Sequence, residues 1–178
     1  MLEKNEIIQS ALRNLKIEEL NPMQEASLEQ ATGRKDVILL SPTGSGKTLA
    51  YLLPLLLTLK PNDDSVQVLI LVPSRELALQ IDSVFKAMGT SWKTCCCYGG
   101  HPIAEEKKSI LSNHPAIIIG TPGRITDHLS KGNFNPETIE TLIIDEFDKS
   151  LEFGFHDEMA EIITQLPGLK KPYVTFSY

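Results

Sequence analysis

A glycine-rich segment between two apolar runs restricts the fold more than any other part of this sequence. Residues 41–48 (SPTGSGKT) follow the apolar run at residues 37–40 and precede a second apolar run at residues 49–53. A strand, a glycine turn and a helix in this order direct backbone N–H groups and the positive end of a helix toward one point, where a phosphate chain can bind. The segment therefore predicts a nucleotide-binding α/β fold.

The residues of this segment have distinct expected roles. Gly44 and Gly46 carry no Cβ, so the backbone can approach phosphates closely. Lys47 is expected to reach the terminal phosphates and the Thr48 hydroxyl to ligate Mg²⁺, as in the pattern G-x-x-x-x-G-K-[ST]. Ser41 replaces the first glycine of that pattern, and a plain glycine turn with a solvated Lys47 is the alternative. The predicted nucleotide-binding residues here are Ser41, Thr43, Gly44, Ser45, Gly46, Lys47 and Thr48.

Short apolar runs alternate with amphipathic helical segments along the rest of the chain. The expected strands lie at residues 37–40, 66–72, 93–98, 116–119, 141–144 and 173–176. The expected helices lie near residues 3–15, 22–31, 49–59, 75–88, 103–111, 125–129 and 151–166. This alternation predicts a parallel sheet with helices on both faces, in which ligands bind at the carboxyl ends of the strands.

Length and charge limit what the chain can be. Its 178 residues suffice for one domain and are too few for two ordinary ones, so residues 1–178 are predicted to form a single domain, expected to be monomeric. The formal net charge of −6 and the pI of about 5.2 exclude a global positive field. Any binding of nucleic acid must therefore be local.

The cysteines and the apolar runs bear on the compartment. Cys95, Cys96 and Cys97 are consecutive, so on a strand they alternate between faces and cannot bind one metal ion together. They indicate small buried residues in a reducing compartment, the cytoplasm. Residues 1–6 are polar and acidic, and the longest apolar run, at residues 49–59, is short and interrupted. No signal peptide or membrane span is therefore expected.

A second candidate site follows another apolar strand. Asp145-Glu146-Phe147-Asp148 comes directly after residues 142–144, so its first acids are expected at the sheet edge that carries residues 41–48. Asp145 suits Mg²⁺, held through a water molecule, and Glu146 could orient or deprotonate an attacking water. A solvated acidic turn is the alternative. The predicted catalytic residues are Lys47, Asp145 and Glu146, and the predicted metal residues are Thr48 and Asp145.

Five segments in this order resemble the first RecA-like domain of a DEAD-box RNA helicase. They are residues 41–48, residues 73–80 (PSRELALQ), Gly99-Gly100, residues 121–124 (TPGR) and residues 145–148. The resemblance covers nearly the whole chain and implies a RecA-like P-loop NTPase fold, with ATP and Mg²⁺ as cofactors. Phe147 stands where the family has alanine, which alters packing but removes no charge.

Gln24 belongs to a segment that resembles the end of the family's glutamine motif. The resemblance implies adenine recognition, because an amide offers one acceptor and two donors to the N6 and N7 atoms of adenine. A solvent-exposed glutamine is the alternative. Two departures from the family are Asn21, where threonine is usual, and the lack of its upstream aromatic residue.

The resemblance also implies a partner, single-stranded or duplex RNA, held through its backbone. Arg75 and Arg124 would supply charge, while glycine loops and helix starts would supply N–H donors. Backbone and 2′-hydroxyl contacts favour RNA without reading its sequence. The alternatives are an ion pair of Arg75 with a carboxylate and a plain turn at Pro122-Gly123. The implied RNA-binding residues are Pro73, Ser74, Arg75, Glu76, Gly99, Gly100, Thr121, Pro122, Gly123 and Arg124.

An ATP-dependent RNA helicase is the function that these resemblances imply. Asp148 would contact a Ser-Ala-Thr motif whose first residue is Ser177, although Tyr178 departs from that motif. A second RecA-like domain in the same polypeptide would supply arginines to the γ-phosphate, so the isolated domain is expected to be weakly active or inactive. The alternatives are a non-hydrolysing, ATP-switched RNA clamp or scaffold and a P-loop NTPase unrelated to RNA.

Overall fold

One sheet of six strands forms the centre of the molecule. The structure, a computed structural model, describes residues 2–30 and 36–176. The strands are β1 (Val37–Leu40), β2 (Val68–Leu71), β3 (Thr94–Cys97), β4 (Ile117–Gly120), β5 (Thr141–Ile144) and β6 (Lys171–Phe176). The helices are α1 (Leu2–Leu15), α2 (Pro22–Glu29), α3 (Lys47–Thr58), α4 (Arg75–Ala87), α5 (Ile103–Asn113), α6 (Pro122–Ser130), α7 (Phe147–Glu152) and α8 (His156–Thr164), with a 3-10 turn η1 (Pro136–Thr138).

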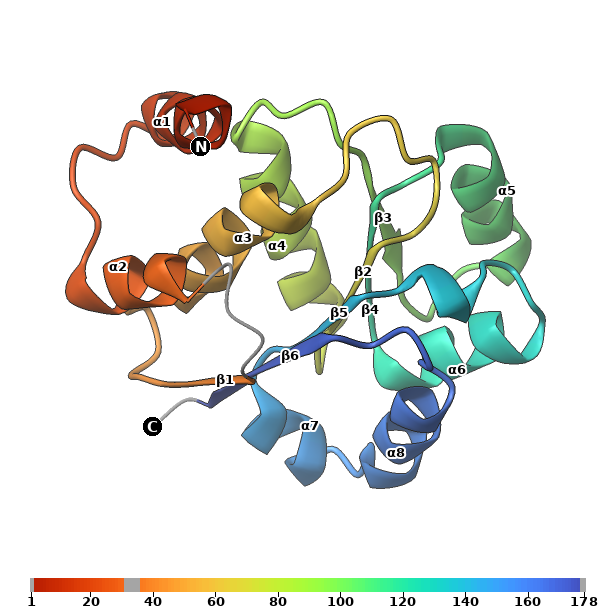
Figure 1. Cartoon of the computed structure of the whole chain (residues 1–178). Coiled ribbons are helices and arrows are strands. Elements are labelled where there is room, and N and C mark those ends of the chain that lie inside the picture. The colour runs from red at the N-terminus through yellow and green to blue at the C-terminus, as the bar shows by residue number, and fades with distance from the viewer. Residues whose placement is uncertain (1, 31–35, 177–178) are drawn as a thin grey trace.

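The strands lie in the order β1-β6-β5-β2-β4-β3, and every neighbouring pair is parallel. The predicted parallel sheet is therefore confirmed, and all six carboxyl ends lie at one edge (Figure 1). β1 and β3 form the two ends of the sheet, whereas β5 and β2 lie side by side in its middle. Residues that follow different strands are thus brought together at this edge.

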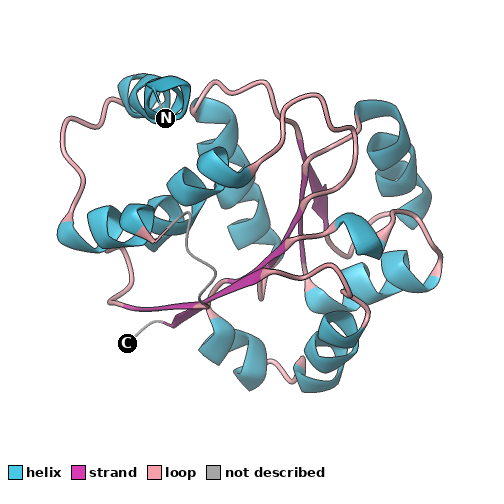
Figure 2. Ribbon diagram, viewed as in Figure 1, coloured by secondary structure: helices cyan, strands magenta, loops and turns pink. Residues whose placement is uncertain are grey.

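Helices cover both faces of the sheet, as the sequence predicted (Figure 2). Along β2, Val68 and Ile70 belong to a core with α1, α3 and α4, whereas Leu69 and Leu71 belong to a core with α5, α6 and α8. Successive residues of a strand point to opposite faces, so an unbroken apolar strand can bury both. β1 is an exception among the described residues, because Ile38 and Leu40 are 69% and 66% exposed.

Side-chain caps fix the starts of two helices. Asn21 and Gln24 form a reciprocal capping box at α2, and Pro22 occupies its first position. The Ser74 hydroxyl caps α4, accepting a hydrogen bond of 3.3 Å from the Leu77 N–H group. None of the described helices is long and apolar enough to span a membrane.

The region after β5 differs from its prediction. Instead of one mainly helical segment at residues 151–166, α7 already begins at Phe147 and α8 follows after a break. Gly154 interrupts the helix with a φ of +84°, a conformation that glycine adopts without steric cost. Phe155, beside this break, packs against the core that α8 covers. β6 also begins two residues earlier than residue 173.

Candidate functional site

The glycine segment forms a tight loop around its own lysine. Gly44 and Gly46 adopt φ values of +79° and +88°, and α3 begins directly after Gly46. The Lys47 ammonium is buried and donates hydrogen bonds to the carbonyl oxygens of Ser41 at 2.8 Å and Pro42 at 2.9 Å. The alternative of a solvated Lys47 is therefore wrong.

The same loop contains a buried hydroxyl, that of Ser45, which has no hydrogen-bond partner among the described residues. A buried polar atom without a partner is costly, and an anion oxygen that accepts from this hydroxyl would remove that cost. Together with the start of α3, the loop thus suits a phosphate group.

Gln24 is buried and ties α2 to this loop. Its Oε1 accepts from the Asn21 N–H group at 3.0 Å, and its Nε2 donates to the carbonyl oxygen of Gly46 at 3.2 Å. Asn21 Nδ2 also donates to the Ser45 carbonyl at 2.9 Å. The solvent-exposed alternative for Gln24 is wrong. Its amide retains one N–H group and one oxygen lone pair that these contacts do not use.

Asp145 lies at the end of β5 as a buried carboxylate surrounded by donors. Its Oδ2 accepts from the Tyr51 hydroxyl at 2.8 Å. Its Oδ1 accepts from the Glu146 N–H group at 3.0 Å and from the Thr175 hydroxyl. Because Asp145 is only 3% exposed, the solvated acidic turn is the wrong description for it. These contacts hold its carboxylate in one orientation.

Tyr51 links the two predicted parts of the nucleotide site. It lies in α3, which starts at Lys47, and is fully buried. Burial raises the pKa of Tyr51 well above its usual range, the Asp145 charge raises it further, and hydrogen bonding with Thr48 opposes this rise. The phenol therefore stays protonated and joins α3, which carries Thr48, to the Asp145 side chain.

Glu146 occupies a less restricted position than Asp145. It precedes α7 in the left-handed region, with φ of 49°, and its N–H group contacts Asp145 Oδ1 and Thr175 Oγ1, each at 3.0 Å. Partial burial and then the Asp145 charge raise the pKa of the Glu146 carboxyl, and nearby Lys47 lowers it to a smaller extent. A raised pKa makes a carboxylate a better proton acceptor.

Tyr51 and Thr175 are site residues that the sequence reasoning missed. A single tyrosine within the otherwise apolar residues 49–57 of α3 was a usable signal, because a buried tyrosine hydroxyl usually has a polar partner. Thr175 lies on β6, and only the strand order shows that it neighbours Asp145. Asp148 lies in the first turn of α7, whereas Ser177 lies outside the described residues.

The segments implied to bind RNA follow β2, β3 and β4, which form the other half of the same edge. After β2, Pro73 is buried while Arg75 and Glu76 are exposed. The Arg75 guanidinium lies 5.0 Å from the centre of the Tyr98 ring, a cation–π contact. No described carboxylate forms an ion pair with Arg75, so the alternative in which Arg75 pairs with a neighbouring carboxylate is not found among the described residues.

The loops after β3 and β4 contact one another directly. Gly99 and Gly100 are exposed, and the Thr121 N–H group donates to the Cys97 carbonyl at 3.1 Å. Pro122 and Gly123 begin α6, so the plain-turn alternative is wrong for them. These contacts set the start of α6 beside the glycine turn.

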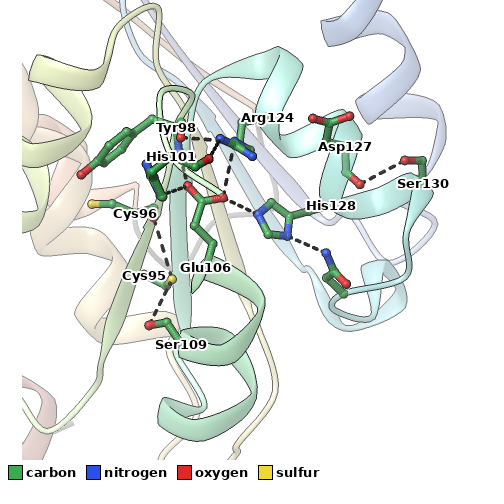
Figure 3. Close-up of polar contacts among 11 residues, drawn as sticks. Cys95, Cys96, Tyr98, His101, Glu106, Ser109, Arg124, Asp127, His128 and Ser130 are labelled. Carbon is green, nitrogen blue, oxygen red and sulfur yellow. Dashed lines mark hydrogen bonds and ion pairs between the residues drawn. The ribbon is translucent and has the colours of Figure 1, made fainter. Parts of the chain in front are cut away.

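Arg124 is largely buried against the loop after β3. Its Nε donates to the Tyr98 carbonyl at 3.2 Å, and a terminal nitrogen donates to the His101 carbonyl at 2.6 Å (Figure 3). The side chain is 11% exposed. Part of its donor capacity therefore serves the protein itself.

Comparison with known proteins agrees with this geometry. Residues 21–177 match the DEAD/DEAH box helicase family. The chain belongs to this family. It is 34% identical over 165 residues to the ATP-dependent RNA helicase CshA of Listeria monocytogenes, covering 92% of this chain and 32% of that protein. It is 33% identical over 162 residues to the DEAD-box ATP-dependent RNA helicase CshA of Geobacillus kaustophilus, covering 90% and 34%.

Solved structures give the same result for the fold. A DEAD box protein from the hyperthermophile Methanococcus jannaschii superposes with a TM-score of 0.87 at 28% identity, covering 96% of this chain and 47% of that one. A hypothetical ATP-dependent RNA helicase from Sulfolobus tokodaii also gives 0.87, at 30% identity, covering 98% and 51%. The chain spans about a third of the length of the two CshA helicases named above.

The DEAD-box segment of this chain carries Phe147 in place of the family's alanine. Phe147 is the first residue of α7 and packs against the core that includes Leu71 and Ile144. Phe147 therefore contributes to packing beside the site, and the three acidic residues of the segment are present.

Proposed function

We propose that this chain is the nucleotide-binding domain of an ATP-dependent RNA helicase. It binds Mg-ATP and the backbone of single-stranded RNA, and couples ATP hydrolysis to local unwinding together with a second RecA-like domain in cis. The observation that supports this most strongly is the hydrogen bond between Tyr51 and Asp145, which joins the phosphate loop to the acidic strand end. The ends of β2, β4 and β3, where RNA is proposed to bind, continue the same sheet edge from β5.

In this proposal, residues 41–48 bind the phosphates of ATP. The Lys47 ammonium moves from the Ser41 and Pro42 carbonyls to the phosphate oxygens, and the Ser45 hydroxyl gains the partner that it lacks within the described chain. Gln24 uses its remaining N–H group and lone pair for adenine. Because Gln24 also contacts Gly46, base recognition and phosphate binding are mechanically connected.

Thr48 and Asp145 are the residues that suit Mg²⁺, since hydroxyl and carboxylate oxygens are its preferred protein ligands. When bound, the ion supplies positive charge to the phosphates as the γ-phosphate bond breaks. Tyr51, Thr175 and the Glu146 amide hold the Asp145 carboxylate in place. Glu146 orients the attacking water and accepts its proton, a role that its raised pKa favours.

RNA is proposed to lie across the ends of β2, β4 and β3. Arg75 contributes positive charge, and the exposed Gly99-Gly100 turn contributes main-chain N–H groups, as does the start of α6. Such contacts bind a sugar-phosphate strand without selecting its sequence. We propose that this takes place in the cytoplasm and that the isolated domain turns over ATP slowly.

RNA-stimulated ATP hydrolysis by the full-length protein tests these roles. We expect Lys47→Ala and Glu146→Gln each to lower the stimulated rate at least about 100-fold, because each removes a group that acts on the reacting phosphate or water. The matched controls are Lys60→Ala and Glu161→Gln, at solvent-exposed positions away from the phosphate loop and from the carboxyl ends of the strands. Unchanged rates in the two site variants would show that the assigned roles are wrong.

The same assay separates the two alternative functions. A protein that binds RNA only in the presence of ATP and releases no phosphate would be an ATP-switched clamp. Equal hydrolysis rates with RNA, with DNA and without polymer would indicate an NTPase unrelated to RNA.

A further inference from the structure

The buried carboxylate of Glu106, on α5, contacts groups from the loop after β3 and from α6. Its Oε1 accepts from the Tyr98 N–H group at 2.8 Å and lies 2.9 Å from His101 Nε2. Its Oε2 lies 2.6 Å from His128 Nε2 and 3.5 Å from Arg124 Nε (Figure 3). Four nitrogen groups therefore surround one carboxylate that is 3% exposed, which balances the cost of burying its charge.

The orientation of His128 is fixed from its other side. Its ring is fully buried, and its Nδ1 lies 3.0 Å from Asn133 Nδ2. With the amide nitrogen donating to Nδ1, the ring proton is on Nε2 and points at Glu106. His128 thus acts as a hydrogen-bond donor that holds the carboxylate on the α6 side.

Glu106 and Arg124 together hold both ends of the glycine turn. Glu106 binds the Tyr98 N–H group and the His101 ring, while Arg124 binds the carbonyl oxygens of the same two residues. Between them, Gly99 and Gly100 are exposed, and no described residue accepts a hydrogen bond from either of their N–H groups. The turn is therefore fixed at its ends and open at its centre.

A metal site is the competing interpretation of this cluster. Cys97 Sγ lies near Glu106 and His128, and the ligand atoms of these three residues are all within 4.8 Å of one another. Each Glu106 oxygen, however, already faces two nitrogen groups. An ion held by these atoms would have to break the contact between His128 Nε2 and Glu106 Oε2, and it would lie near the Arg124 guanidinium. These contacts favour a hydrogen-bonded cluster over a metal centre.

We infer that Glu106 is a positioning residue for RNA binding. It acts with Arg124 to hold residues 98–101 against the start of α6, so that the N–H groups of Gly99 and Gly100 face the RNA strand. The Arg124 guanidinium serves mainly to shape this surface, and the main-chain amides make the phosphate contacts. This inference rests on the proposed RNA-binding function and names the group that organises its surface.

The test compares Glu106→Ala with Glu105→Ala in the full-length protein. Glu105 precedes Glu106 on α5 and is exposed, so its substitution removes the same charge without touching the cluster. Hydrogen exchange of residues 98–101 and 121–124 is measured without RNA. Affinity for a fluorescent single-stranded RNA and for a fluorescent ATP analogue is measured separately.

For Glu106→Ala we expect faster exchange in both loops and an RNA Kd raised by about tenfold, because buried donors lose their acceptor. The Kd for the ATP analogue should stay within about twofold of wild type, since none of the Glu106 contacts reaches the phosphate loop. Glu106→Gln should have an RNA affinity between those of wild type and Glu106→Ala, because the amide oxygen still accepts from the Tyr98 N–H group but the amide nitrogen cannot accept from His128 or Arg124. Glu105→Ala should match wild type in every measurement.

Arg124→Lys provides an independent variant if Glu106→Ala unfolds the protein. Lysine keeps the positive charge, but a single ammonium does not reproduce the forked contacts to Tyr98 and His101. We expect the same local increase in exchange and the same loss of RNA affinity. Retained affinity in Arg124→Lys would mean that charge alone matters there and would overturn the inference.

Three other results would also overturn it. One is a Glu106→Ala protein that matches Glu105→Ala in loop exchange. Another is faster loop exchange with unchanged RNA affinity. A third is zinc bound in stoichiometric amount to the purified protein and lost on substitution of Glu106 or His128. If the wild-type protein binds no RNA, the proposed function is wrong, and so is the role of Glu106 in RNA binding. Hydrogen exchange of the loops would still show whether Glu106 holds the glycine turn.

Discussion

The Tyr51 hydroxyl donates a hydrogen bond of 2.8 Å to Oδ2 of Asp145, a residue 94 positions further along the chain. Tyr51 lies one turn into the helix that begins at Lys47, and Asp145 directly follows the central strand β5. This contact fixes the distance between the phosphate loop and the acidic segment. A fully buried phenol is a rigid connection, because few side-chain conformations are open to it.

Tyr51→Phe should separate this connection from simple packing, because it removes only the hydroxyl. We expect the free energy of unfolding to fall by about 1–2 kcal/mol, since Asp145 loses a buried donor. The Mg²⁺ concentration for half-maximal RNA-stimulated hydrolysis should rise by about tenfold, as the carboxylate becomes less well oriented. Chemical denaturation and a Mg²⁺ titration measure the two effects, with Tyr98→Phe as the control for stability. An unaltered Mg²⁺ requirement would contradict the orienting role.

Glu146→Gln should stabilise the folded protein while abolishing stimulated hydrolysis. The folded-state pKa of Glu146 is raised by burial and by Asp145, so the wild-type carboxyl favours folding at low pH and loses that contribution as pH rises through the raised pKa. Gln does not titrate. The Tm of the Glu146→Gln protein should therefore equal that of wild type near pH 4 and exceed it by about 1–2 °C at pH 7.

Thermal unfolding followed by circular dichroism between pH 4 and pH 8 measures this difference. Glu161→Gln, at an exposed position on α8, serves as the control. A difference in Tm that is the same at both pH values would show that ionisation of Glu146 does not cause it.

Gly46→Ala should damage the contact between α2 and the phosphate loop. A Cβ at this position would lie 2.5 Å from Gln24 Nε2 and 3.4 Å from Asn21 Nδ2, and φ is +88°. We expect a loss of about 1–3 kcal/mol in unfolding free energy from strain and displaced contacts. Gly99→Ala, where a Cβ meets nothing within 4 Å, should stay within about 0.5 kcal/mol of wild type in the same denaturation experiment. Equal losses in both variants would be inconsistent with this explanation.

Ser74 allows helix capping and RNA binding to be tested separately. Ser74→Ala should cost about 1 kcal/mol of stability, because the Leu77 N–H group loses its acceptor. Ser74→Asp should restore the cap but lower RNA affinity, because it places a negative charge beside the proposed phosphate path. Denaturation and RNA titration at two salt concentrations distinguish these effects. RNA affinity that follows stability in both variants would leave Ser74 with a capping role alone.

The positions of the strands could be predicted from the sequence, but their order could not. Apolar runs such as residues 141–144 are long enough to be strands and are bounded by polar turns, so their positions agree with β1 to β6 to within two residues. A parallel strand, however, connects to its neighbour through a helix of variable length, and the apolar pattern does not specify which strand that neighbour is. The contact between Thr175 and Asp145 depends on the pairing of β5 with β6 and was therefore missed.

The sequence around Glu106 contains a signal that could have predicted a buried partner for this residue. Ile103, Glu106 and Ile110 recur at spacings of three and four residues, so Glu106 lies in the apolar stripe of α5 while the adjacent Glu105 does not. A charged residue in such a stripe predicts a buried partner. The identity of the partners, on α6 and in the loop after β3, required the pairing of β3 with β4.

The pairing of β2 with β5 has a consequence for how ATP turnover reaches RNA. The Asp145 N–H group donates to the Leu71 carbonyl at 2.9 Å, just two residues before Pro73. A displacement of the acidic segment on loss of the γ-phosphate would pass through a single peptide hydrogen bond to the strand that carries the first proposed RNA contact. In the proposed function, communication within this domain would therefore need no hinge, since the proposed ATP and RNA sites lie on adjacent strands of one sheet.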